Sequence, residues 1–219
     1  MDVLKLIQQI DELFYEVFAA LVFFPKTLWL MLRFPQRMMD YADAELGDVL
    51  NEQYNDSISP PKFMMLCLGV GYLSERAQGH IMISKELPAW MQNWETILTF
   101  RMLLFSVIPL IMALQLVRHL GQCLDRTALR PPFYSQCYLG GILLLINITI
   151  STVYQTGIFN SYATSILAAF SIGWYIENQA LWFKNKLDVC YLKGLAVALH
   201  SLLISMISIA ALVAMAFVI

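Results

Sequence analysis

Four stretches of this chain are long and apolar enough to cross the hydrocarbon core of a bilayer, which restricts its fold more than any other feature. They cover residues 94–117, 134–156, 161–183 and 195–219. A helix needs about 20 mostly apolar residues to cross roughly 30 Å of hydrocarbon. With 59% hydrophobic and 14% charged residues, the chain is also too apolar for an ordinary water-soluble domain. We therefore predict an all-α, polytopic membrane protein surrounded by the lipid bilayer.

A fifth stretch, residues 62–82, is a weaker candidate for a membrane span. It opens with the apolar run FMMLCLGVGYL and then carries Ser74, Glu75 and Arg76. It can span only if the two charges reach the interface or lie among other helices. The alternative is a re-entrant or interfacial segment. With this span included, we expect a bundle of about five transmembrane helices.

The distribution of Lys and Arg favours five spans with a cytoplasmic N-terminus and the C-terminus outside. Cytoplasmic loops of membrane proteins are enriched in these two residue types. In this topology five lie inside within residues 1–62, three within 118–130 and three within 184–193, whereas only Arg76 and Lys85 lie outside. Arg101 falls within the second span, close enough to its outer end for the side chain to snorkel.

The first 60 residues are expected to form a cytoplasmic segment, and residues 61–219 the transmembrane domain. Apolar residues recur at helical spacing from Val3 to Val22, with charged and polar residues between them, which predicts an amphipathic helix. We expect Pro25 to break it and Thr27 to cap a second short turn. The segment lies either on the inner leaflet, with Lys26 and Trp29 at headgroup level, or against the cytoplasmic end of the bundle.

Residues 38–61 carry six acids and no Lys or Arg. This stretch forms either a docking surface for a basic partner or a weak divalent-cation site, or simply a solvated helix face and linker. The last is favoured, since the acids lack the spacing of a calcium loop. The four cysteines match no zinc or cluster pattern. No stripe of basic residues suits nucleic acid, and we expect no metal and no cofactor.

Polar residues within the predicted spans are the candidate site, because each is costly in lipid. Asn147, Ser151 and Tyr154 share one face of the third span and are expected to point inward. They either line a transport path or form hydrogen bonds between helices. Glu177 and His200 lie at similar depth in the last two spans and could meet. Such a pair could relay protons, form a structural hydrogen bond, or leave Glu177 in cytoplasmic water.

Small residues and one proline mark expected helix contacts. Gly69 and Gly71 in the first span and Gly140 and Gly141 in the third should allow helices to approach closely. Pro109 should bend the second span. The sequence contains no nucleophile elbow, no histidine-rich metal set and no phosphate-binding glycine loop, so an enzyme is not expected.

Two short patterns, FFPKTLWLMLRFP at residues 23–35 and SPPKFMML at 59–66, followed by clustered spans, resemble the bacterial branch of the Yip-domain membrane proteins. That resemblance implies a permease-like helical fold in a bacterial inner membrane. The acidic DLYGP-type motif of the eukaryotic members is absent, and only GVGYL at 69–73 lies in a comparable place. A trafficking role therefore does not carry over.

Three functions remain open. The preferred one is a non-enzymatic scaffold or regulatory subunit of a membrane complex, with a protein partner at residues 1–60 or on the bundle. The second is a small permease or channel, with the polar face of the third span along its path. The third is a membrane enzyme acting on a lipid-linked substrate, with Glu177 and His200 as acid and base. A homo-oligomer is compatible with all three.

Overall fold

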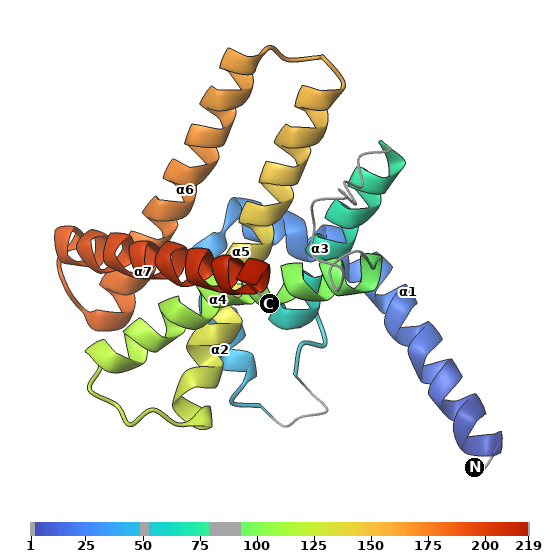
Figure 1. The fold of residues 1–219 in the computed structure, drawn as a ribbon. Coiled ribbons are helices and arrows are strands. Elements are labelled where there is room, and N and C mark those ends of the chain that lie inside the picture. Colours follow the sequence, from blue (N-terminus) through green and yellow to red (C-terminus); the bar gives the residue numbers. More distant parts are fainter. Residues whose placement is uncertain (1–2, 49–52, 79–92, 219) are drawn as a thin grey trace.

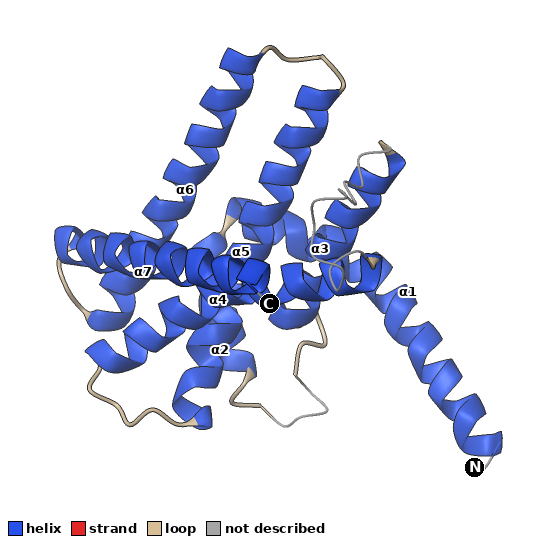
Figure 2. Ribbon diagram, in the orientation of Figure 1, coloured by secondary structure: helices blue, strands red, loops and turns tan. Residues whose placement is uncertain are grey.

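The computed structural model describes residues 3–48, 53–78 and 93–218, with the side chains from residue 18 onward except those of Trp94 and Val218. These residues form helices and connecting loops without a strand (Figure 2). The helices are α1 (Val3–Arg33), α2 (Pro35–Glu45), α3 (Pro60–Ala77), α4 (Trp94–His119), α5 (Arg126–Gln155), α6 (Ser161–Leu187) and α7 (Tyr191–Val218). The all-α prediction is confirmed.

Three of the described helices are long and apolar enough to cross a membrane: α4, α5 and α7. The expected number of about five is therefore wrong for the described residues, because α3 and α6 do not qualify. Helix α3 has 18 residues, three of them charged: Lys62, Glu75 and Arg76. Helix α6 carries Glu177, Asn178 and Gln179 in succession, and the latter two are buried inside the protein instead of facing lipid.

Helix α5 lies at the centre of the fold and packs against α2, α3, α4 and α6 (Figure 1). Helix α6 returns beside α5, whereas α4 and α7, which pack on each other, run across this pair (Figure 1). The N-terminal part of α1 projects away from the rest (Figure 1). The helices thus cross, and they do not form a bundle of parallel spans.

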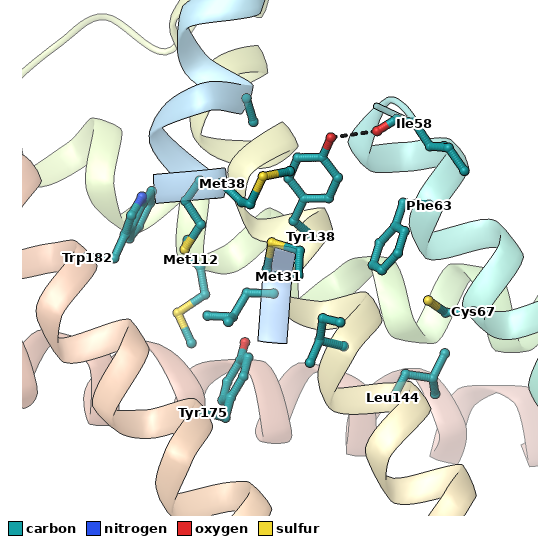
Figure 3. Close-up of a cluster of buried hydrophobic side chains, with 14 of the residues drawn as sticks. Met31, Met38, Ile58, Phe63, Cys67, Met112, Tyr138, Leu144, Tyr175 and Trp182 are labelled. Carbon is teal, nitrogen blue, oxygen red and sulfur yellow. Dashed lines mark hydrogen bonds between the residues drawn. The ribbon is translucent and has the colours of Figure 1, made fainter. Parts of the chain in front are cut away.

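Residues of α1 and α2 contribute to the same core as the apolar helices. Met31, Met38, Met39 and Ala42 are buried together with Tyr138 of α5 and Trp182 of α6 (Figure 3). Residues 27–45 thus pack against the other helices, and the position of the amphipathic helix before them, on the inner leaflet or against the cytoplasmic end of the spans, stays a prediction. The proposed boundary at residue 60 stays a prediction, and one core contains residues from both sides of it.

Polar side chains of α5 form hydrogen bonds with backbone carbonyl groups of the N-terminal segment. Ser135 donates its hydroxyl to the Met39 carbonyl at 2.8 Å and also contacts Asp43. Tyr138 donates to the carbonyl of Ile58 (Figure 3). The amide of Ile58 in turn donates to the hydroxyl of Thr27. Each of these bonds satisfies a buried polar group that would otherwise destabilise the fold.

The predicted break at Pro25 is wrong, since α1 continues through this residue to Arg33. A proline inside a helix costs about 3 kcal/mol. Apolar contacts on both sides of Pro25 offset that cost: Phe24 packs on Phe63 with ring centroids 5.4 Å apart, and Met31 is fully buried. Thr27 does not begin a second helix, because its hydroxyl accepts the hydrogen bond from Ile58.

Part of the acidic stretch is bound within the protein. Asp40 and Asp43 both pair with Lys186 of α6, at 2.9 and 2.8 Å. Glu45 accepts a hydrogen bond from the amide of Tyr54. Several residues used in the sequence analysis lie outside the described part of the chain: Glu52, Lys85, residues 79–82 of the expected first span, and the side chains of residues 3–17.

Glycines allow the closest approaches between helices. A Cβ on Gly71 would lie 2.3 Å from Cδ1 of Ile148, and one on Gly141 would lie 3.1 Å from the Phe63 ring. Close helix contact was expected at these two glycines, and the structure shows that it joins α3 to α5. Gly140 faces Pro109 of α4 at 3.4 Å, but Gly69 has open space beside it and makes no such contact.

Gly194 of α7 provides a test of helix packing. A Cβ there would lie 2.6 Å from the backbone oxygen of Ala180 and 2.9 Å from the Lys184 nitrogen, so Gly194→Ala must push α6 and α7 apart. We expect a loss of about 1–3 kcal/mol of stability, measured as a lower Tm in detergent. The control is Gly173→Ala in α6, which has the same gain in helix propensity and no neighbour within 4 Å. Equal Tm values for the two variants would contradict the packing of α7 on α6.

Lys186 provides a test of the docking of α2. Burial alone lowers the pKa of Lys186, but hydrogen bonds and charge from Asp43 and Asp40 outweigh it and raise the pKa above 10.5. Its stabilising contribution is therefore complete below pH 10.5 and is lost as the pH rises through the folded-state value. We expect Lys186→Gln to cost about 1 kcal/mol and to speed proteolysis of α2, unlike Lys184→Gln at an exposed position. Equal rates of proteolysis of α2 in the two variants would show that the ion pairs of Lys186 do not bind α2 to α6.

Candidate functional site

A cavity of about 320 Å³ opens between α3, α4 and α5. It exists because two of the surrounding helices present small or rigid residues to each other: Gly140 of α5 has no side chain, and Pro109 of α4 packs over it. The space is within the range of small-molecule sites, about 300–1,000 Å³. Its lining includes Asn147 and Ser151, two of the polar residues singled out in the sequence.

One part of the cavity wall is apolar. It is formed by side chains from all three helices, with Tyr175 of α6 as a further contact: Met64, Phe105, Ile108, Pro109, Leu143, Leu144 and Ile148. Leu144 and Tyr175 also belong to the buried hydrophobic core (Figure 3). This part of the wall can accept only an apolar group, because a polar group placed here would lose its hydrogen bonds to water.

The rest of the wall is polar and comes from the C-terminal halves of two helices. On α5 it consists of Asn147, Ser151, Thr152 and Gln155, and on α3 of Glu75 and Gln78. The α5 residues follow one another at helical spacing, so they share a face. The cavity therefore has an apolar end and a polar end.

Hydrogen bonds fix the polar end. The hydroxyl groups of Ser74 and Thr152 lie 2.9 Å apart, and the Gln78 amide donates to both. These bonds join α3 to α5. Glu75 and Arg101 form a salt bridge of 2.6 Å that joins α3 to α4. Both of its side chains are more than a third exposed, so the pair neutralises charge at the edge of the apolar region but adds little stability.

Two of the five predicted site residues line this cavity. Asn147 uses its amide nitrogen to donate to the Leu143 carbonyl in its own helix. Ser151 accepts a weak hydrogen bond of 3.4 Å from Gln155. Tyr154 was expected to share their inward face, but it is 50% exposed and does not line the cavity, so this expectation is wrong. Thr152 and Gln155, and not Tyr154, line the cavity wall together with Asn147 and Ser151.

Glu177 and His200 are both exposed. Within the described part of the chain, neither side chain takes part in a hydrogen bond or a salt bridge. His200 lines a different cavity, between α4 and α7, whose described lining does not include Glu177. Their meeting therefore stays a prediction.

Gln136 of α5 and Gln179 of α6 form a fully buried pair next to Tyr175. The Gln136 amide donates to Gln179 at 2.9 Å, and Gln179 donates back at 2.6 Å. Gln179 also donates to the hydroxyl of Tyr175, which lines the cavity. In this way polar residues inside the apolar region satisfy one another, as buried amides must.

The sequence analysis missed the pairing of Glu75 with Arg101 and that of Gln136 with Gln179. For the first pair a signal was present: each charge interrupts an apolar stretch, and opposite charges in neighbouring helices tend to pair. For the second pair no comparable signal existed, because Gln136 is 43 positions from Gln179 and helical periodicity carries no information on which helices touch.

The polar residues that line the described cavity are amides, hydroxyls and an ion-paired carboxylate. Among the residues that the structure describes, no cluster of three or more His, Cys, Asp or Glu could hold a metal ion. The arrangement can bind an apolar group at one end and form hydrogen bonds at the other.

The buried glutamine pair can be tested by single and double substitution. Gln136→Leu leaves buried hydrogen-bonding groups of Gln179 without their partner, at a cost of about 1–3 kcal/mol. We expect the double variant Gln136→Leu/Gln179→Leu to lose less stability than the sum of the losses in the two single variants, since no unpaired amide is then left buried. Thermal unfolding of the four proteins in detergent gives the coupling. Additive losses would show that the two amides do not bond to each other.

Neither a scan against protein-family models, nor a search of curated proteins, nor a search of solved structures found a match to this chain. The likeness to the Yip-domain proteins thus gains no support and rests on the two short patterns alone. The functional interpretation consequently depends on the geometry of the site.

Proposed function

We propose that this protein is a non-enzymatic membrane protein that binds a small amphiphilic molecule between α3, α4 and α5. The observation that supports the proposal is the separation of the cavity into an apolar wall and a polar end with Asn147, Ser151 and Gln155. An amphiphile matches such a cavity, because its chain removes apolar surface from water while its head forms hydrogen bonds.

The polar end favours an uncharged head. Glu75, its acid, is already paired with Arg101, and the remaining groups are amides and hydroxyls. These can donate and accept hydrogen bonds but cannot neutralise a charge. The ligand class is therefore an alcohol, an amide or a glyceride with one short chain.

Binding is favoured over continuous conduction by what lies beyond the apolar wall. Next to Leu144 and Tyr175 the core is close-packed, with Phe63, Tyr138 and Trp182 almost fully buried (Figure 3). Buried polar groups at this level, such as Gln136 and Gln179, bond to each other. Passage through the protein would require this core to rearrange, as in a carrier, so a permease is compatible with the proposal and a static channel is not.

A scaffold function is the second candidate, and one observation favours it. The N-terminal part of α1 projects away from the other helices (Figure 1). The part of α1 that is described with side chains also exposes large apolar residues at helical spacing, among them Phe18, Val22 and Trp29. Such a stripe can bind either lipid or the helix of a partner.

We place the N-terminal segment on the cytoplasmic side of a bacterial inner membrane. The support is the enrichment of Lys and Arg in the residues that precede α4, which include Lys26, Arg33 and Arg37. This enrichment remains when only α4, α5 and α7 are counted as spans. With α4, α5 and α7 as the spans and the N-terminal segment inside, Cys123, exposed beyond the end of α4, lies outside. A membrane-impermeant maleimide should therefore label it on intact cells, and labelling only after permeabilisation would contradict this orientation.

Photo-crosslinking with a diazirine-bearing fatty alcohol tests the proposed ligand site. We expect the probe to label residues of the cavity wall in the wild-type protein, with labelling reduced about tenfold in Ser151→Phe, whose ring would fill the polar end. Ser165→Phe, at an exposed position on α6, is the control and should keep wild-type labelling. Labelling restricted to lipid-facing surfaces in all three proteins would reject the proposal.

A further inference from the structure

A second cavity, of about 390 Å³, lies between α4 and α7 and shares no lining residue with the amphiphile pocket. Gln115, Arg118 and His119 of α4 line it together with His200 and Ile204 of α7. None of these described residues carries a carboxylate, whereas one is a permanent cation and two are imidazoles. We propose that this cavity binds a phosphate-type oxyanion, held as the headgroup of an anionic phospholipid.

Gln115 supplies an amide to the cavity. Only 5% of this residue is exposed, and it lines the cavity. Its side-chain amide makes no hydrogen bond to any residue that the structure describes. The amide atoms are open to the cavity and not sealed in the protein, so a ligand there can accept their hydrogen bonds in place of water. The oxygens of a phosphate are strong acceptors.

Arg118 supplies the charge. A guanidinium can bind a phosphate through two parallel hydrogen bonds, and no described carboxylate pairs with Arg118. The carbonyl groups at the end of α4 would repel an anion, but three of them accept hydrogen bonds from the following turn. Leu120 donates to Leu116, Gly121 to Arg118, and Gln122 to Val117. Gly121 makes this turn possible with its positive φ of 64°.

The two histidines complete the set of donors. Nδ1 of His119 lies 2.8 Å from the Gln115 carbonyl. A carbonyl only accepts hydrogen bonds, so Nδ1 carries a proton and Nε2 is the ring atom left for a ligand. His200 makes no hydrogen bond to the described residues and adds a second imidazole from α7. A metal ion fits less well, because Arg118 repels a cation and zinc sites use three or four protein ligands.

The position of the cavity points to a lipid as the source of the phosphate. Helix α4 ends at His119, and lipid phosphates lie where membrane-spanning helices end. Leu199 and Leu203, 47% and 59% exposed, lie beside His200 on α7 and can contact the acyl chains. A free phosphate would use the same donors without these contacts.

Native mass spectrometry of the full chain, released from nanodiscs, tests the proposal. The nanodiscs contain phosphatidylglycerol and phosphatidylcholine in equal amounts, and calorimetry with inorganic phosphate in detergent forms the second arm. We expect the wild-type protein to retain phosphatidylglycerol selectively. Retention should fall about tenfold in Arg118→Gln and in His200→Gln, as for the loss of one charge-assisted hydrogen bond.

Arg126→Gln is the matched control, because it also removes an exposed arginine but lies outside the cavity. It should retain lipid as the wild type does, and Arg118→Lys should retain more than Arg118→Gln. Binding of inorganic phosphate that depends on Arg118, without lipid selectivity, would support the oxyanion site and assign it to free phosphate. No selective binding in the wild type, or equal losses in Arg118→Gln and Arg126→Gln, would overturn the proposal. Labelling of the amphiphile pocket is independent of either result.

Discussion

The packing of neighbouring helices against α5 is the constraint on which the rest of this structure depends. Helices α2, α3, α4 and α6 all contact α5, and the closest approaches use positions without side chains, Gly71 and Gly141. Apolar surface alone would not select these contacts in a membrane, where lipid is as apolar as the helices. Close packing and specific hydrogen bonds therefore have to decide the arrangement.

The hydrogen bonds of α5 change character along its length. Near its N-terminus Ser135 and Tyr138 bind the segment between α1 and α3. Gln136, which lies between these two residues in the sequence, pairs with α6, and towards the C-terminus Thr152 bonds to α3. The amphiphile pocket extends along α5 from Gly140 to Gln155 and includes Thr152 in its wall. A single helix thus holds the fold together and forms the longest wall of the candidate site.

The N-terminal segment shows why a pattern along the chain does not determine where an element lies. An amphipathic stripe indicates that one face is buried, but lipid and protein are equivalent partners for such a face. Met31 and Met39 are buried in protein, and the acids Asp40 and Asp43 pair with Lys186, Asp40 at an exposed position and Asp43 at a partly buried one. Charge content that predicted a solvated helix face is in part used to bind α2 to α6.

The sequence by itself determined the helical class, the long apolar segments that form α4, α5 and α7, and the presence of Asn147 and Ser151 in a polar face, because hydropathy and periodicity are local properties. Only the tertiary structure decided that Glu75 meets Arg101, that Gln136 meets Gln179, that Tyr154 faces outward and that α6 buries Asn178 and Gln179 in protein. These outcomes depend on which helices cross and at which residues. That choice results from packing between segments far apart in the chain, about which the spacing of residues within one helix carries no information.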